Sequence, residues 1–312
     1  ALPICILWSL IKERFILNPV VKKITTAVLC VTALTSPLFL TGCSFSKVAN
    51  SVQQGVQKGS QEDVKVFNNY IKAVGDFNSH TVRFGYAIGP DIQKLREGQH
   101  LTSFMAPHFD SLQEKLQAAK DAGVPYDDMK EPLDKVLAVL KDIVPVASEL
   151  DTYYQTNTYK ADNYAKEQQL GPKYVQLYDQ FYAAYNQLDA VIHKHNTENQ
   201  QAHLKELKES GKKNAAAAQE VHLRLTALLD GFEEGKQIDV NAANQELQGI
   251  MDVSNSITSP EYNSAKNSLN TAIGRIRTFI GDQTNDHYND MIESYNSFIG
   301  SMNRLDMNKL DK

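Results

Sequence analysis

Histidines and carboxylates are the side chains in this sequence most able to bind a metal or to transfer a proton. His193 and His195 are two residues apart, about 200° around a helix, and so cannot share an ion. His195 and His203 are separated by two helical turns, which is too far for one ion. Asp76 and His80 share a helical face, but one carboxylate and one imidazole do not complete a site. We therefore expect no metal centre and no bound cofactor.

Nucleophilic and phosphate-binding motifs are also missing. The sequence contains no G-x-S-x-G elbow, no G-x-x-x-x-G-K-[ST] loop and no H-E-x-x-H helix. A catalytic site would have to be gathered from distant helices, which a sequence pattern does not reveal. The expectation is therefore a protein without enzymatic activity.

One cysteine lies in a pattern with a defined chemistry, Leu40-Thr41-Gly42-Cys43. Two lysines and an apolar stretch from Ile24 to Leu40 precede it, as in a secretory signal peptide. The four residues resemble the lipobox at which bacteria cleave and lipidate secreted proteins. This resemblance implies a diacylglycerol thioether on the Cys43 sulfur and a further acyl chain, such as palmitate, on the freed amine. More than one chain suffices for stable membrane anchoring; a chance cysteine in an uncleaved helix is the alternative.

The residue after the lipidated cysteine affects where such proteins are sorted. Ser44, rather than an aspartate, occupies this position. By resemblance to Gram-negative lipoproteins, it implies the outer membrane, with the protein body facing the periplasm.

Four segments are predicted from these signals: 1–20 upstream sequence absent from the native precursor, 21–42 signal peptide, 43–61 lipidated cysteine and tether, and 62–308 helical domain. The late start is expected because the first methionine is Met105, and Val21-Lys22-Lys23 has the form of a signal-peptide opening. The alternatives are a long native leader and a membrane helix over 4–17, which contains three charged residues and is too short to span.

The segment 44–61 is rich in Ser, Gln, Gly and Asn. As a flexible coil it would hold the domain roughly 20 to 25 Å from the bilayer. Phe45, Val48, Val52 and Val56 recur at helical spacing, so a short helix lying against the lipid headgroups is the alternative.

Charge and cysteine content narrow the function further. The chain has a net charge of −5, and loss of the leader removes four basic residues and one acidic residue, leaving about −8. A protein with this negative net charge binds nucleic acid poorly, because the phosphates repel it. All three cysteines lie at or before the cleavage site, so the mature chain would contain no disulfide.

Beyond Gln61, apolar residues recur every three or four positions, which predicts an all-α fold. We expect an elongated antiparallel bundle of about five to seven helices. The predicted helices cover 62–86, 107–122, a segment from 126 kinked by Pro145, a segment from Pro172 after a break at Gly171, 215–232, a segment capped by Asp239, and a long final segment from Pro260. The polar stretch 193–214 is expected to form an exposed helical extension or a solvent-facing hairpin tip, and Gly281-Asp282 is where the final segment would break.

Tyrosines are concentrated between positions 153 and 185. Their amphipathic rings suit contacts with a protein or glycan partner, and the best candidates are Tyr153, Tyr154, Tyr159, Tyr164 and Tyr182. The alternative is that the rings line the bundle seam, which the spacing of Tyr174, Tyr178 and Tyr185 favours.

Three segments rich in aromatic residues resemble a known family. Phe67-Asn68-Asn69-Tyr70-Ile71, the run from Tyr153 to Lys166, and Tyr295-Asn296-Ser297-Phe298-Ile299 are similar to YiiG-type bacterial lipoproteins. The resemblance covers about residues 64–305. It implies a secreted, lipidated helical domain of unknown function and supplies no catalytic residues.

A second, partial resemblance concerns metal binding. The segment from Gly98 to Ser103 is similar to the GxHxxE signature of imelysin-type envelope proteins, but Ser103 stands where the acid belongs. We therefore expect a lipid-anchored, non-enzymatic envelope protein that binds an envelope protein or glycan. An imelysin-like carrier of a metal or small ligand is the alternative.

Overall fold

The computed structural model describes residues 61–232 and 237–312, and this part of the chain is built from helices without a strand. The predicted all-α fold is confirmed. The residues of the predicted lipobox, Leu40, Thr41, Gly42 and Cys43, and those of the predicted tether up to residue 60 lie outside the described residues.

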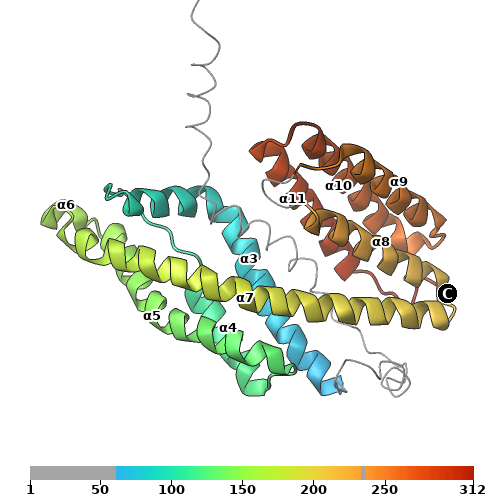
Figure 1. Ribbon diagram of the computed structural model, residues 1–312, viewed down its shortest axis with the longest axis horizontal. Coiled ribbons are helices and arrows are strands. Elements are labelled where there is room, and N and C mark those ends of the chain that lie inside the picture. Colours follow the sequence, from blue (N-terminus) through green and yellow to red (C-terminus); the bar gives the residue numbers. More distant parts are fainter. Residues whose placement is uncertain (1–60, 233–236) are drawn as a thin grey trace, which may run out of the picture.

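The first half of the described chain forms one helical bundle (Figure 1). Its members are α3 (Gln61–Arg96), α4 (Phe109–Ala122), α5 (Lys130–Gln155), the short α6 (Tyr159–Asp162) and the first half of α7 (Ala165–Glu209). A single turn of 3-10 helix, η3 (Asp127–Met129), leads into α5. Aromatic rings fill the centre of this bundle, where Phe181 contacts Phe77 and Phe109 at centroid distances of 5.5 and 4.8 Å.

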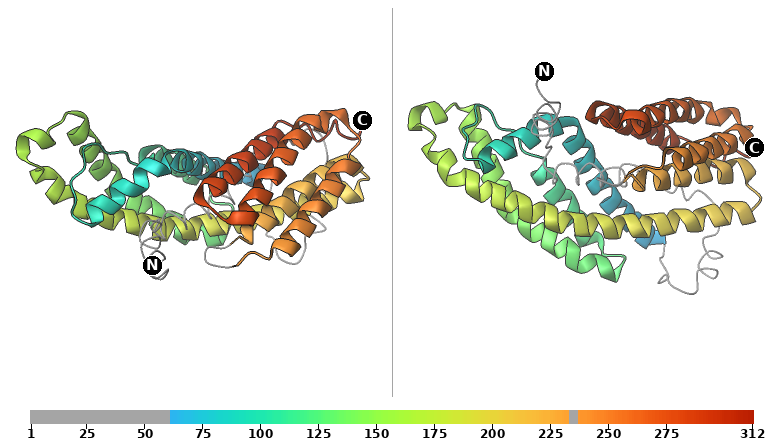
Figure 2. Two further views of the ribbon diagram at one scale, coloured as in Figure 1. Left: turned by 90° about the horizontal axis from the view of Figure 1, so that it is seen from above. Right: turned by 45° about the horizontal axis from the view of Figure 1, so that its top comes forward.

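The second half of the chain forms another bundle on the same long helix, as the two views of Figure 2 show. It contains α8 (Lys213–Asp230), α9 (Val240–Ser256), the 3-10 turn η4 (Pro260–Tyr262), α10 (Asn263–Asp282) and α11 (Asn285–Asn303). α8 packs back on the second half of α7 after the turn at 210–212. The 45 residues of α7 make it about 68 Å long, so one helix serves both bundles.

The described residues contain nine α-helices, so the prediction of five to seven was too low. One reason is the segment 156–164, where Asn157, Asn163 and Tyr164 adopt positive φ angles of 55°, 52° and 65° and separate α5, α6 and α7. Nothing in the hydrophobic spacing marks these positions, because left-handed backbone in non-glycine residues is uncommon.

Two positions were predicted to interrupt a helix, and both predictions were wrong. α3 continues through Pro90 and α7 continues through Gly171-Pro172. A Cβ on Gly171 would lie 3.2 Å from Leu95 of α3, so this glycine permits close packing rather than a break.

The polar stretch 193–214 is helical up to Glu209, and a tight turn then leads into α8. The predicted exposure was wrong for one face, because His195, Asn196 and Gln200 are buried. Asp239 caps α9 as expected, accepting a hydrogen bond from the Ala242 N–H at 3.0 Å.

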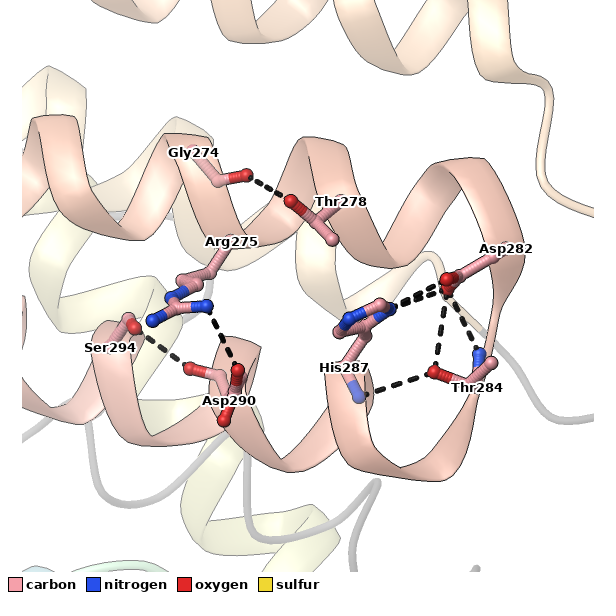
Figure 3. Close-up of polar contacts among 8 residues, drawn as sticks. All are labelled: Gly274, Arg275, Thr278, Asp282, Thr284, His287, Asp290 and Ser294. Carbon is pink, nitrogen blue, oxygen red and sulfur yellow. Dashed lines mark hydrogen bonds and ion pairs between the residues drawn. The ribbon is translucent and has the colours of Figure 1, made fainter.

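The last long segment breaks beside Asp282, as predicted (Figure 3). Gln283 adopts φ 52°, and the hydroxyl of Thr284 accepts a hydrogen bond from the His287 N–H at 3.3 Å. The His287 ring lies 2.7 Å from the Asp282 carboxylate, and this contact lowers the pKa of Asp282. Farther from the turn, Arg275 pairs with Asp290 at 3.0 Å. Caps and ion pairs thus close α10 onto α11.

The aromatic centre of the first bundle gives a test of the fold. Phe181 is fully buried, so Phe181→Ala should lower the free energy of unfolding by about 3 to 5 kcal/mol, whereas Phe181→Leu should cost clearly less because it retains most of the volume. Urea denaturation followed by circular dichroism measures both values. Equal, small losses in the two variants would show that this ring is not central to the core.

Candidate functional site

A buried carboxylate, Glu167, organises the end of the first bundle where α5, α6 and α7 meet. Glu167 lies in the first turn of α7, seven residues before Tyr174, so helical spacing directs both side chains inward. Only 4% of Glu167 is exposed. Burial of an ionised carboxylate requires charge-assisted hydrogen bonds, and the surrounding residues supply them.

Three donors surround the Glu167 carboxylate. Its Oε2 accepts hydrogen bonds from the Leu101 N–H at 2.9 Å and from the Tyr154 hydroxyl. Its Oε1 lies 2.5 Å from Nδ1 of His100. The three contacts tie the loop between α3 and α4 to the ends of α5 and α7.

His100 is the accessible member of this group. Its side chain is 45% exposed, and its ring stacks on Tyr164 with a centroid distance of 3.9 Å and an interplanar angle of 12°. Because Glu167 engages Nδ1, the carboxylate fixes the orientation of the ring. The result is an oriented imidazole beside a half-buried tyrosine ring at the surface.

The tyrosines at this end are linked to acidic and amide side chains. Tyr153 donates to Asp162 at 2.7 Å, and Tyr159 donates to Asn157 at 3.3 Å. Burial, reinforced by the hydrogen bond to Glu167, raises the pKa of Tyr154, and burial together with Asp162 does the same for the pKa of Tyr153. These hydroxyls therefore act as permanent donors that hold the segment 153–167 in shape.

The five tyrosines proposed as partner contacts do not share one environment. Tyr153, Tyr154 and Tyr159 are buried at this end, while Tyr182 is buried in the bundle centre against Tyr178 and Tyr185. Only Tyr164 is partly exposed. Tyr182 shares the buried face of α7, whereas Tyr153 and Tyr154 lie at the end of α5 and Tyr159 begins α6. Four of the five candidates are buried and lack the exposure that a partner contact needs.

The structure also supplies the acid that the sequence motif around His100 lacks. Ser103 occupies the motif position, but Glu167, distant in the sequence, places its carboxylate against His100. All the same, the described residues contain no group of three or more His, Cys, Asp or Glu side chains arranged to hold a metal ion. The pair on its own supports an oriented surface imidazole rather than a metal centre.

The other histidines have separate partners. His195 lies between Asp128 at 2.6 Å and Glu198 at 3.1 Å and stacks on Tyr126 at 3.7 Å, which fastens α7 to η3. Burial alone would raise the pKa of Asp128, but hydrogen bonds from His195 and Lys194 outweigh it and lower that pKa.

His193 and the Asp76 and His80 side chains, which were also considered from the sequence, contact residues of other elements. His193 faces Asp230 of α8 at 3.2 Å. Asp76 pairs with Lys115, and the His80 ring stacks on His108. Each of these groups fastens two elements together.

Sequence reasoning missed Glu167 and another buried carboxylate, Asp189. A signal was present, because Glu167 continues the inward stripe of Leu170 and Tyr174, and Asp189 shares a face with Tyr185. A carboxylate on an apolar stripe indicates a buried polar contact, but its partners come from other helices.

Two substitutions of Glu167 separate its charge from its hydrogen bonds. Glu167→Gln keeps an acceptor for Leu101 and Tyr154 and should cost about 1 to 2 kcal/mol of stability. Glu167→Ala leaves both buried donors unpaired and should cost at least about 2 kcal/mol more. Urea midpoints measure the difference, with the exposed Glu131→Ala as control. Equal losses for Gln and Ala would contradict the hydrogen-bond network.

Comparison with known proteins places the chain in a family. A family model described as a protein of unknown function, DUF3829, matches residues 47–268, which include the first bundle, α8, α9 and the start of α10. No curated protein and no solved structure matches the chain. Within the described residues, no helix is both long and apolar enough to cross a bilayer. The chain belongs to the DUF3829 family of proteins of unknown function.

Proposed function

We propose that this chain is a lipid-anchored bacterial envelope protein of the YiiG type, which binds or scaffolds another envelope component without catalysing a reaction. The observation that carries the proposal is Leu40-Thr41-Gly42-Cys43 at the end of an apolar stretch preceded by two lysines. The family match supports the same boundary, since it begins at residue 47, shortly after Cys43.

The anchor defines how the helical body would be presented. Acyl chains on Cys43 would hold the N-terminus in the membrane, and the segment 44–60 would connect them to α3. Ser44 favours the outer membrane, where the body would face the periplasm. Both bundles would then be available to a partner in the envelope.

The surface around Tyr164 is the best candidate for the contact with that partner. Tyr164 and His100 present stacked rings there, and α6 carries the exposed Lys160 beside them. In Figure 1, α6 lies at the end of the elongated body, remote from the second bundle. Tyrosine, histidine and lysine side chains can contact a protein or a glycan through ring faces and hydrogen bonds.

A second candidate function rests on the His100–Glu167 pair. A carboxylate that orients an imidazole is a common feature next to metals, so an imelysin-like carrier of a metal or small ligand is the alternative. Elemental analysis of protein purified without added metal distinguishes the two functions. Stoichiometric metal that is lost in His100→Ala would favour the carrier; a metal-free protein with unchanged His100 would favour the scaffold.

The anchor leads to a paired prediction. Cys43→Ser should abolish incorporation of labelled palmitate and move the protein from the membrane fraction to the soluble fraction. Ser44→Asp should keep the label and shift the protein to the inner membrane in a Gram-negative host. Fractionation on a sucrose gradient measures both outcomes, and palmitate labelling that survives Cys43→Ser would refute the lipidation site.

The partner surface can be tested by photocrosslinking in intact cells. A photoreactive residue at Lys160 should capture one defined envelope component, whereas the same residue at the exposed Asn270 of α10 should not. Tyr164→Ala should reduce the yield at Lys160 at least about fivefold, and the buried Tyr182→Phe should leave it unchanged. Equal capture at both positions, or no effect of Tyr164→Ala, would exclude this surface as the specific contact.

A further inference from the structure

A second buried carboxylate, Asp189, lies near the middle of α7, where the two bundles meet on this helix. Only 3% of Asp189 is exposed, and its Oδ1 is buried without a hydrogen-bond partner. Buried carboxylates are normally paired or hydrogen-bonded on both oxygens. An oxygen left unpaired at a junction between bundles therefore calls for a physical explanation.

The neighbours of Asp189 come from both bundles. From the first bundle, α3 contributes Asn78, whose Oδ1 accepts a hydrogen bond from the Tyr185 hydroxyl at 2.7 Å. From the second, α8 contributes Asp230, which lies 3.2 Å from His193. Tyr185, Asp189 and His193 follow one another at four-residue spacing on one face of α7. Asp189 is the middle member of a polar ladder that crosses from one bundle to the other.

Burial, rather than the charges around this ladder, favours a neutral Asp189. The titratable groups that face it are His193 and Tyr185 on α7 and Asp230 on α8, while α3 offers the neutral Asn78. Burial raises the pKa of Asp189 to about 7; His193 and Asn78 oppose the rise and Asp230 adds to it. The protonated and ionised forms thus exchange in the range of pH that an envelope protein meets.

We propose that Asp189 is a proton-operated latch between the two bundles. In its protonated form it fits the closed junction of α3, α7 and α8, because a neutral carboxyl tolerates an unpaired oxygen. In its ionised form the same oxygen needs water or a donor, so the junction loosens locally. Because folding raises the pKa of Asp189, its stabilisation of the closed junction is complete at pH values below the pKa of aspartate in the unfolded chain, about 3.9. This stabilisation is lost as the pH rises through about 7.

Hydrogen exchange on the full-length protein tests the latch. We expect protection factors, corrected for the intrinsic pH dependence of exchange, to fall at least tenfold between pH 5.5 and 8.5 for amides at 186–195 and 226–230. The isosteric Asp189→Asn, which is always neutral, should keep the high protection at both pH values. The exposed Asp142→Asn on α5 is the matched control and should behave as the wild type.

His193 could itself cause a pH effect, and a further variant separates the two groups. His193→Gln should retain the loss of protection but shift its midpoint upward, since it removes the positive charge that favours ionised Asp189. Loss of the pH effect in His193→Gln, or its persistence in Asp189→Asn, would assign it to another group and overturn the proposal.

A measurement on the wild type alone guards against a variant that does not fold. Difference infrared spectra should show the C=O stretch of a buried carboxylic acid that disappears with a midpoint near pH 7. Absence of any carboxylic acid band that titrates between about pH 6 and 8 would overturn the latch, whatever the variants show.

Discussion

The continuity of α7 is the constraint on which the rest of the structure depends. One helix has to bury one face against α3 and α5 along its first half and against α8 along its second half. Its inward residues therefore change in character, from Tyr174, Phe181 and Tyr185 to the polar His195, Asn196 and Gln200. A stripe of uniform hydrophobicity would bury the first half well but would leave the second half without the polar partners found there.

Polar groups inside the two bundles are satisfied to different degrees. In the second bundle, Gln200 bonds Gln219 of α8, and Thr226 bonds Tyr295 of α11 at 2.8 Å. In the first, Glu167 is surrounded by three donors, whereas Asp189 retains an unpaired oxygen. Fully bonded networks fix one arrangement of the helices, while a partly bonded one leaves an alternative within reach. Asp189, near the middle of α7, is therefore less completely bonded than Glu167 in its first turn.

Helical periodicity predicted most of the fold, because apolar residues at three- and four-residue spacing report directly on buried faces. The cap at Asp239 and the break beside Asp282 followed from local chemistry alone. Gly171-Pro172 led to a wrongly predicted break, because Gly171 packs against Leu95 of α3 and the sequence pattern does not show contacts between distant segments. The same holds for the site: His100 and the tyrosines stood out in the sequence, but Glu167 gained its significance only when the fold brought it to His100. The proposed lipobox rests on consecutive residues alone, so it needs no contact between distant segments.

The length of α7 has a mechanical consequence. Each end of this helix lies about 34 Å from its midpoint, so a bend of about 10° there would displace an end by roughly 6 Å. A rearrangement of a few side chains around the midpoint would be amplified into a shift as large as a full turn of helix at the far ends. α7 can therefore act as a lever that pivots near its midpoint, close to the incompletely bonded Asp189.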